Sequence, residues 1–76
     1  MKTKIKILRT SIGMTQQQLA DLVYVTERTI ISIEKELYTP SLMLAYRISE
    51  IFGTTVEDLC YLKENKVLED KQYENL

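Results

Sequence analysis

The segment TQQQLADLVYVTERTIISIEK, residues 15–35, decides the fold of this chain because its apolar and polar residues are spaced as in two short helices joined by a tight turn. Thr15 and Gln18 form a Thr-x-x-Gln capping box, which marks the start of the first helix. The apolar residues that follow fall on one helical stripe: Leu19, Leu22 and Val23. This spacing predicts a helix that buries one face.

Thr26 repeats the cap, so we expect the second helix to begin there. Apolar residues follow at i, i+3 and i+7 and form an inward face: Ile30, Ile33 and Leu37. At 100° per residue, the outer face carries Glu27, Arg28, Ile31, Ser32 and Lys35. A helix with a positive dipole at its start and polar groups on its outer face fits the major groove of DNA, which is about 12 Å wide.

The rest of the chain predicts three more helices around the same core, and therefore an all-α five-helix bundle. A helix over residues 4–11 stops near Gly13, another begins beside Pro40 and ends at Gly53, and Thr55 caps the last one. Thr39 or Ser41 caps the helix beside Pro40. The inward residues of these three helices are, in order, Ile5, Leu8 and Ile12; Leu44, Ala45, Ile48, Ile51 and Phe52; and Val56, Leu59 and Cys60.

The last stretch of the chain, KENKVLEDKQYENL, is polar, mixed in charge and without sustained periodicity. We therefore expect one domain over residues 1–62 and an extended or fraying polar tail over residues 63–76.

Charge is distributed unevenly along the chain. The formal net charge is −1, but residues 1–35 contain six basic and three acidic residues, whereas the remainder contains four basic and eight acidic residues. Phosphates respond to charges within a Debye length of about 10 Å, so the local excess matters more than the total. The positive half is the half that contains the two helices described first.

Several classes of protein are excluded by composition. No apolar run approaches the ~18 residues of a membrane span, and the lysine-rich start lacks the long apolar region of a signal peptide, so we expect a cytoplasmic protein. Cys60 is the only cysteine and there is no histidine, which argues against an intramolecular disulfide and the usual zinc sites. We expect no enzyme, cofactor, metal or small-molecule site, because acid–base histidines, phosphate-binding glycine loops and paired carboxylates are missing.

From Ile5 to about Leu62, the chain resembles the Cro and phage-repressor helix-turn-helix family, also called the xenobiotic response element family. The matching positions are Leu8-Arg9, Gly13, Thr15-Gln16, Leu19-Ala20, the Thr26 cap, Ile33-Glu34, the Tyr38 to Leu42 turn with Pro40, and the Gly53 to Leu59 run. The resemblance implies a lambda-repressor-like fold and a sequence-specific regulator of transcription, with residues 26–36 in the major groove of double-stranded DNA.

The resemblance also implies roles for individual residues. Family members read base edges from the outer row of this helix, which here is Glu27, Arg28, Ile31 and Ser32. Phosphate contacts are expected from Gln16, Thr26, Thr29 and Lys35. The family pairs the positions of Arg9 and Glu34, which we expect to form a structural ion pair. A plainer interpretation remains for each: Arg28 as an ordinary surface residue, Gln16 as a solvated first turn, and Ile31 as cover for a neighbour.

Three residues depart from the family pattern. Glu27 would repel phosphate unless it accepts from cytosine or holds Arg28 in position. Tyr24 and Glu36 stand where the family usually has glycine in the turns before and after the second helix. If the turn is kept, Tyr24 adopts a left-handed conformation at a cost of about 1 to 2 kcal/mol.

One such helix carries few base-reading side chains, so we expect a homodimer on a near-palindromic operator, acting as a repressor. Apolar residues near the end of the domain predict the dimer surface: Val56, Cys60, Tyr61 and Leu62. The alternative is a helix-turn-helix scaffold that binds a partner protein through Ile31, Leu37 and the acidic half of the chain.

Overall fold

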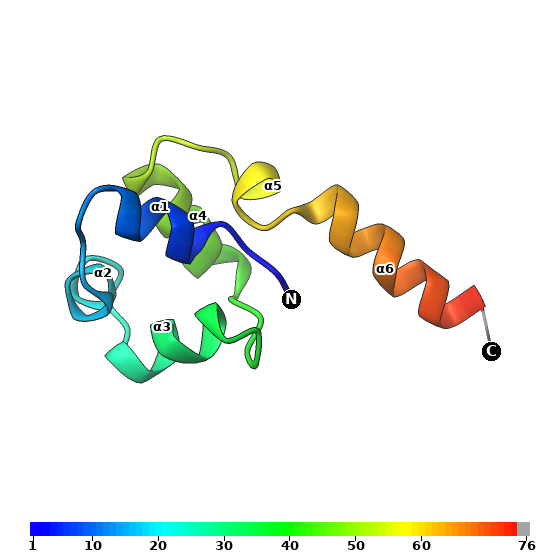
Figure 1. Cartoon of the computed structure of the whole chain (residues 1–76), viewed down its shortest axis with the longest axis horizontal. Helices are drawn as coiled ribbons and strands as arrows, with labels where there is room; N and C mark the ends of the chain where they lie inside the picture. The colour runs from blue at the N-terminus through cyan, green and yellow to red at the C-terminus, as the bar shows by residue number, and fades with distance from the viewer. Residues whose placement is uncertain (75–76) are drawn as a thin grey trace.

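The computed structural model describes residues 1–74 and arranges them in six helices (Figure 1): α1 Ile5–Ser11, α2 Gln16–Leu22, α3 Glu27–Glu34, α4 Leu42–Ile51, α5 Val56–Leu59 and α6 Leu62–Glu74. Helices α1 to α5 form the bundle, and α6 projects away from it. The projection makes the molecule elongated, with dimensions of 41 × 23 × 21 Å. The prediction of an all-α bundle is confirmed, with one helix more than expected.

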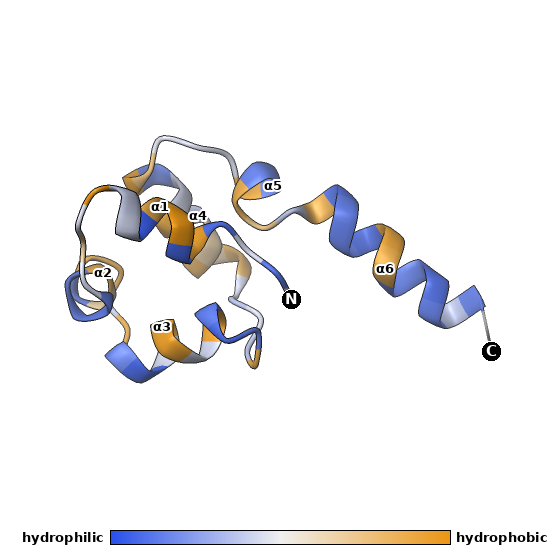
Figure 2. Cartoon of the chain, viewed as in Figure 1, coloured by the Kyte–Doolittle hydropathy of each residue, from blue (hydrophilic) through white to orange (hydrophobic). Residues whose placement is uncertain are grey.

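The core of the bundle is formed by apolar side chains that are almost fully shielded from solvent. They are Ile5, Leu19, Ala20, Val23, Ile30, Ile33, Leu44, Ala45, Ile48, Leu59 and Cys60. Figure 2 shows hydrophobic and hydrophilic residues alternating along the bundle helices, whereas α6 is mainly hydrophilic. Burial of the apolar face of each bundle helix drives the packing of α1 to α5.

Four helices begin at hydroxyl caps. The Thr15 hydroxyl accepts from the Gln18 backbone N–H at 3.0 Å, and the Gln18 side chain accepts from the Thr15 N–H at 2.8 Å, which confirms the capping box. Thr26 caps α3, Thr55 caps α5, and Ser41 is the cap of α4. Each cap satisfies a backbone donor that the helix itself leaves without a partner.

Three residues predicted to face inward are exposed instead: Ile12, Leu22 and Leu37. Ile12 follows the end of α1, immediately before Gly13 reverses the chain with φ of +70°. Leu37 also lies beyond the end of a helix, directly after the left-handed residue Glu36 that follows α3. Leu22 lies at the edge of the α2 stripe, where Val23 takes the buried position. For Ile12 and Leu37, the helical period no longer predicts burial because the helix has ended.

We predicted an extended or fraying tail, and the extended form is wrong for residues 63–74, because they belong to helix α6. Their composition of Lys, Glu, Leu and Gln favours helix, although no sustained apolar stripe is present. The Lys66 ammonium contacts the Asp70 carboxylate one turn later, which raises the pKa of Lys66 and supports the helix locally. Residues 75–76 of the predicted tail lie outside the described residues.

Candidate nucleic-acid interface

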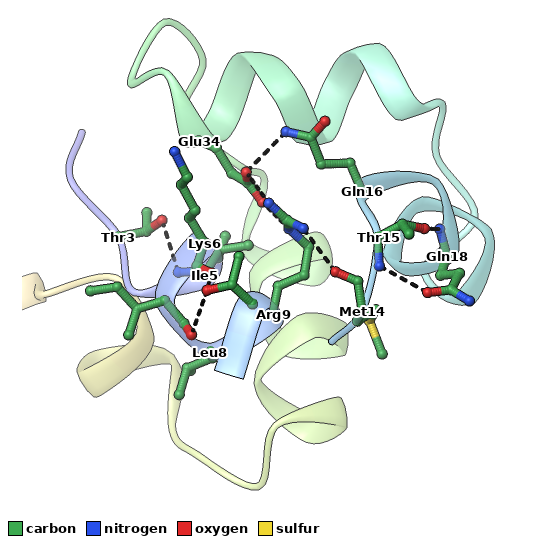
Figure 3. Close-up of polar contacts among 12 residues, drawn as sticks. Thr3, Ile5, Lys6, Leu8, Arg9, Met14, Thr15, Gln16, Gln18 and Glu34 are labelled. Carbon is green, nitrogen blue, oxygen red and sulfur yellow. Dashed lines mark hydrogen bonds and ion pairs between the residues drawn. The ribbon is translucent and has the colours of Figure 1, made fainter. Parts of the chain in front are cut away.

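A polar network joins α1, α2 and α3 (Figure 3). The Arg9 guanidinium donates to both carboxylate oxygens of Glu34, from Nε to Oε2 at 2.7 Å and from Nη2 to Oε1 at 2.9 Å. Its Nη1 donates to the Met14 carbonyl at 2.8 Å. The Gln16 amide donates to Glu34 Oε1 at 3.0 Å. Arg9 therefore contacts both the end of α3 and the loop that leads into α2.

This network is shielded from solvent, since the Arg9 and Glu34 side chains are 10% and 3% exposed. The hydrogen bond to Glu34 raises the pKa of Arg9, and burial opposes that shift. Gln16, for which we expected a phosphate contact, is half-buried and engaged with Glu34. In the structure, the contact of Gln16 with Glu34 fixes the start of α2 relative to α3.

The turn between α2 and α3 has the left-handed geometry expected of the family's glycine position. Tyr24 adopts φ of +63°, which confirms the prediction for this residue, and Glu36 also has φ of +63°. The Tyr24 ring is exposed and lies 5.3 Å from the Arg47 guanidinium of α4. The Val25 N–H donates to the Ala20 carbonyl at 3.1 Å, and this hydrogen bond closes the turn.

Apart from Gln16, which begins α2, the residues predicted to contact DNA lie together on α3 and its ends. Thr26, Glu27, Arg28 and Lys35 are exposed, whereas Thr29, Ile31 and Ser32 are half-buried. Ile30 and Ile33 anchor the opposite face in the core. The helix therefore presents a polar row while its other side is held rigidly by the bundle.

Two residues beside this row were not among those predicted to contact DNA, although Leu37 was a candidate for contact with a partner protein. Leu37 and Tyr38 border a shallow hollow of about 280 Å³, together with Thr26, Arg28, Thr29 and Ser32 from α3. The turn at Glu36 brings them there, because it reverses the chain directly after α3. The signal available in the sequence was Glu36, which stands where the family usually has glycine in a turn.

The basic residues near the N-terminus do not all add to the α3 face. Lys2 and Lys4 place their ammonium groups 5.5 Å and 5.3 Å from the centre of the Tyr61 ring. Arg9 is already paired with Glu34. Arg28 and Lys35 are therefore the exposed cations that α3 and its C-terminal end supply directly.

The predicted dimer residues differ in how far they are exposed. Cys60 is 1% exposed and belongs to the core, which confirms its predicted inward position and removes it from the exposed surface predicted for the dimer. Burial also raises the pKa of its thiol. Val56 packs partly against the core, Tyr61 is half-buried beneath the lysines, and Leu62 is exposed. Only part of the predicted set is thus available to a partner.

A family model for the helix-turn-helix matches residues 5–59, a span that includes the α2–turn–α3 unit and the helices that brace it. The chain belongs to the helix-turn-helix family. Its fold is the lambda-repressor-like helical bundle that the resemblance implied. Within residues 1–74, no helix has the length and apolarity needed to cross a bilayer, and no three possible metal ligands cluster.

Relatives of this helix-turn-helix protein occur in archaea and bacteria. Two proteins of Archaeoglobus fulgidus are 41% identical over 71 residues and 48% identical over 59 residues. These alignments cover 93% and 78% of this chain, and 100% and 84% of the relatives. A Bacillus subtilis protein is 44% identical over 64 residues, covering 84% of this chain and 97% of its own length. All three bear the name uncharacterised HTH-type transcriptional regulator.

Proposed function

We propose that this protein is a DNA-binding transcriptional regulator that places α3 in the major groove. The observation that carries the proposal is the exposed polar row of α3, held against the bundle by Ile30 and Ile33 and braced at its end by Arg9 and Glu34. A rigid helix with a polar outer face meets the geometric demand of the groove. The naming of the relatives as transcriptional regulators supports the same conclusion.

Within this proposal, Arg28 is the main base reader and Lys35 contacts the phosphate backbone. An arginine bound to guanine O6 and N7 contributes about 1 to 3 kcal/mol of discrimination between bases. Glu27, Ile31 and Ser32 supply the other base contacts, and Thr26 and Thr29 supply phosphate contacts. The contact between the Thr26 and Thr29 hydroxyls, 3.2 Å apart, holds these two groups together at the start of the helix.

The proposal extends to a homodimer that represses transcription from a near-palindromic operator. A single α3 offers few base-reading side chains, and a two-fold arrangement doubles them on half-sites about 34 Å apart. Two-fold symmetry of the protein then requires a near-palindromic sequence in the DNA.

Selection of binding sites from random duplexes tests the role of α3. Arg28→Ala should relax the preference at one base pair in each half-site, whereas Lys35→Ala should weaken all duplexes similarly and lower the salt slope by about one unit. Arg47→Ala is the control for loss of a cation elsewhere. Arg47 belongs to α4, and its guanidinium lies over the Tyr24 ring. An unchanged selected site and affinity for Arg28→Ala would exclude it as a base reader.

Binding of a partner protein is the second candidate, favoured by Leu37, which is 77% exposed beside α3. The two functions differ in their response to salt. Phosphate neutralisation gives a steep loss of affinity for random duplex DNA as salt rises, and docking of a protein through Leu37 does not. A flat salt response together with absent duplex binding would favour the protein-binding function.

A further inference from the structure

Helix α6 is a 13-residue helix that stands apart from the bundle. No residue between 62 and 74, a fully described stretch, is buried, and its large apolar residues are exposed: Leu62, Val67, Leu68 and Tyr73. An isolated helix of about this length is marginally stable in water. Packing against another surface would therefore stabilise α6.

The base of α6 is fixed to the bundle. The Asn65 amide donates to the Cys60 carbonyl at 2.7 Å and to the Lys2 carbonyl at 3.0 Å, and the Lys4 N–H donates to the Leu59 carbonyl at 2.8 Å. Tyr61, with φ of +47°, turns the chain into α6. These contacts hold the first turn of α6 and direct the rest of the helix away from the bundle (Figure 1).

One face of α6 borders a hollow of about 410 Å³ beside the bundle. From α6 the hollow is lined by Asn65, Leu68, Glu69 and Gln72, and from the opposite side by Met1, Lys2, Glu36 and Thr39. Leu68 is 59% exposed at this place. It lies at the midpoint of α6, which runs from residue 62 to residue 74.

Charge is divided along α6. Four cations gather at its base, Lys63 and Lys66 of α6 with Lys2 and Lys4 over Tyr61, and three carboxylates lie beside them, Glu64, Asp58 and Glu57, the last of which is paired with Lys63. Its outer half carries three acidic residues, Glu69, Asp70 and Glu74, against one lysine, Lys71. The base thus has an excess of one positive charge and the tip an excess of two negative charges. Two such helices attract each other when antiparallel and repel when parallel.

We propose that α6 pairs antiparallel with α6 of a second copy of this chain, with Leu68 of each copy at the two-fold axis. The pairing is self-complementary, as a two-fold interface requires: each positive base meets a negative tip, and Leu68 meets its own counterpart. The proposal rests on the homodimer of the proposed function and gives that homodimer its interface.

Disulfide trapping tests the position of Leu68. Leu68→Cys should form a covalent dimer on oxidation with copper phenanthroline, since residues at a two-fold axis approach within the Cα separation of a disulfide, below about 7 Å. Val67→Cys is the matched control, because Val67 is similarly exposed but lies 100° around the helix. Equal trapping of both variants, or trapping of Val67→Cys alone, would overturn the proposed axis. The unaltered chain, with buried Cys60, reports any background.

Charge reversal tests the antiparallel direction. A variant with Lys63→Glu and Lys66→Glu, and another with Glu69→Lys and Asp70→Lys, should each self-associate severalfold more weakly in sedimentation equilibrium. An equimolar mixture should recover association, because the acidic base of one chain then meets the basic tip of the other. Each variant loses the contact between Lys66 and Asp70, so recovery cannot come from repair of the helix. No recovery in the mixture contradicts the antiparallel arrangement.

Both measurements are made without DNA, which separates this proposal from the proposed function. A salt titration of random duplex binding by the unaltered chain reports the DNA activity independently. DNA binding with trapping at neither Leu68 nor Val67 would overturn the α6 interface alone. Trapping at Leu68 without DNA binding would overturn the proposed function and leave the interface standing.

Discussion

Two helix junctions in this molecule use the same device at very different depths. In the bundle, Arg9 reaches the Glu34 carboxylate and the Met14 carbonyl, and the ion pair is almost entirely buried. At the base of α6, Asn65 reaches the carbonyls of Lys2 and Cys60 beside solvent. The buried bridge holds helices of the bundle together, whereas the bridge beside solvent only sets the direction in which α6 leaves the bundle.

The largest effect is expected at the buried junction. Glu34→Ala leaves the Arg9 guanidinium buried without its counterion, which should lower the free energy of unfolding by about 3 to 5 kcal/mol. Urea denaturation followed by circular dichroism measures this. The exposed pair of Lys63 and Glu57 is the control, and Glu57→Ala should change stability by less than about 0.5 kcal/mol. Similar losses in both variants would contradict the importance of depth.

A smaller effect is expected at the α6 junction. Asn65→Ala removes two hydrogen bonds at the start of α6 and should cost about 1 kcal/mol or slightly more. The loss should concentrate in α6, so amide hydrogen exchange should accelerate there while the protection of α3 and α4 is retained. Uniform acceleration over all helices would show that α6 and the bundle form one cooperative unit.

The smallest effect is expected when glycine replaces either of the two tyrosines with positive φ, Tyr24 and Tyr61. Tyr24→Gly should raise the free energy of unfolding by a few tenths to about 1 kcal/mol, because glycine adopts positive φ without strain and Tyr24 is exposed. Tyr61→Gly should gain less or destabilise, because the half-buried Tyr61 ring also lies under two lysines. Thermal unfolding of the two variants ranks them, and a greater gain at Tyr61 would reverse the comparison.

The bundle was largely predictable from the sequence because its signals are local. Helix starts are marked by the caps Thr15, Thr26 and Thr55, and helix ends by Gly13 and Gly53. The apolar spacing between these residues identifies the buried faces. Helix α6 was missed for the opposite reason. Its apolar residues follow no continuous stripe, since it packs against nothing within the described chain over most of its length.

The candidate site was predictable as a row of residues on α3 but not as a surface. The network that joins Gln16 to Glu34 and the arrival of Tyr38 beside Arg28 depend on how distant segments meet. The surplus of positive charge in the first half of the chain was also misleading in part, because Lys2 and Lys4 lie over Tyr61. Spacing along one helix cannot report contacts of this kind.

Because Cys60 is buried, chemical modification of its thiol reports that the chain has opened. It is the only thiol in the sequence, it is 1% exposed, and burial raises its pKa, so in the folded state it has little reactive thiolate. A thiol reagent in excess therefore labels a molecule only after the region around α5 has opened. Electrophiles or oxidants would accordingly mark unstable copies first, and leave folded copies intact.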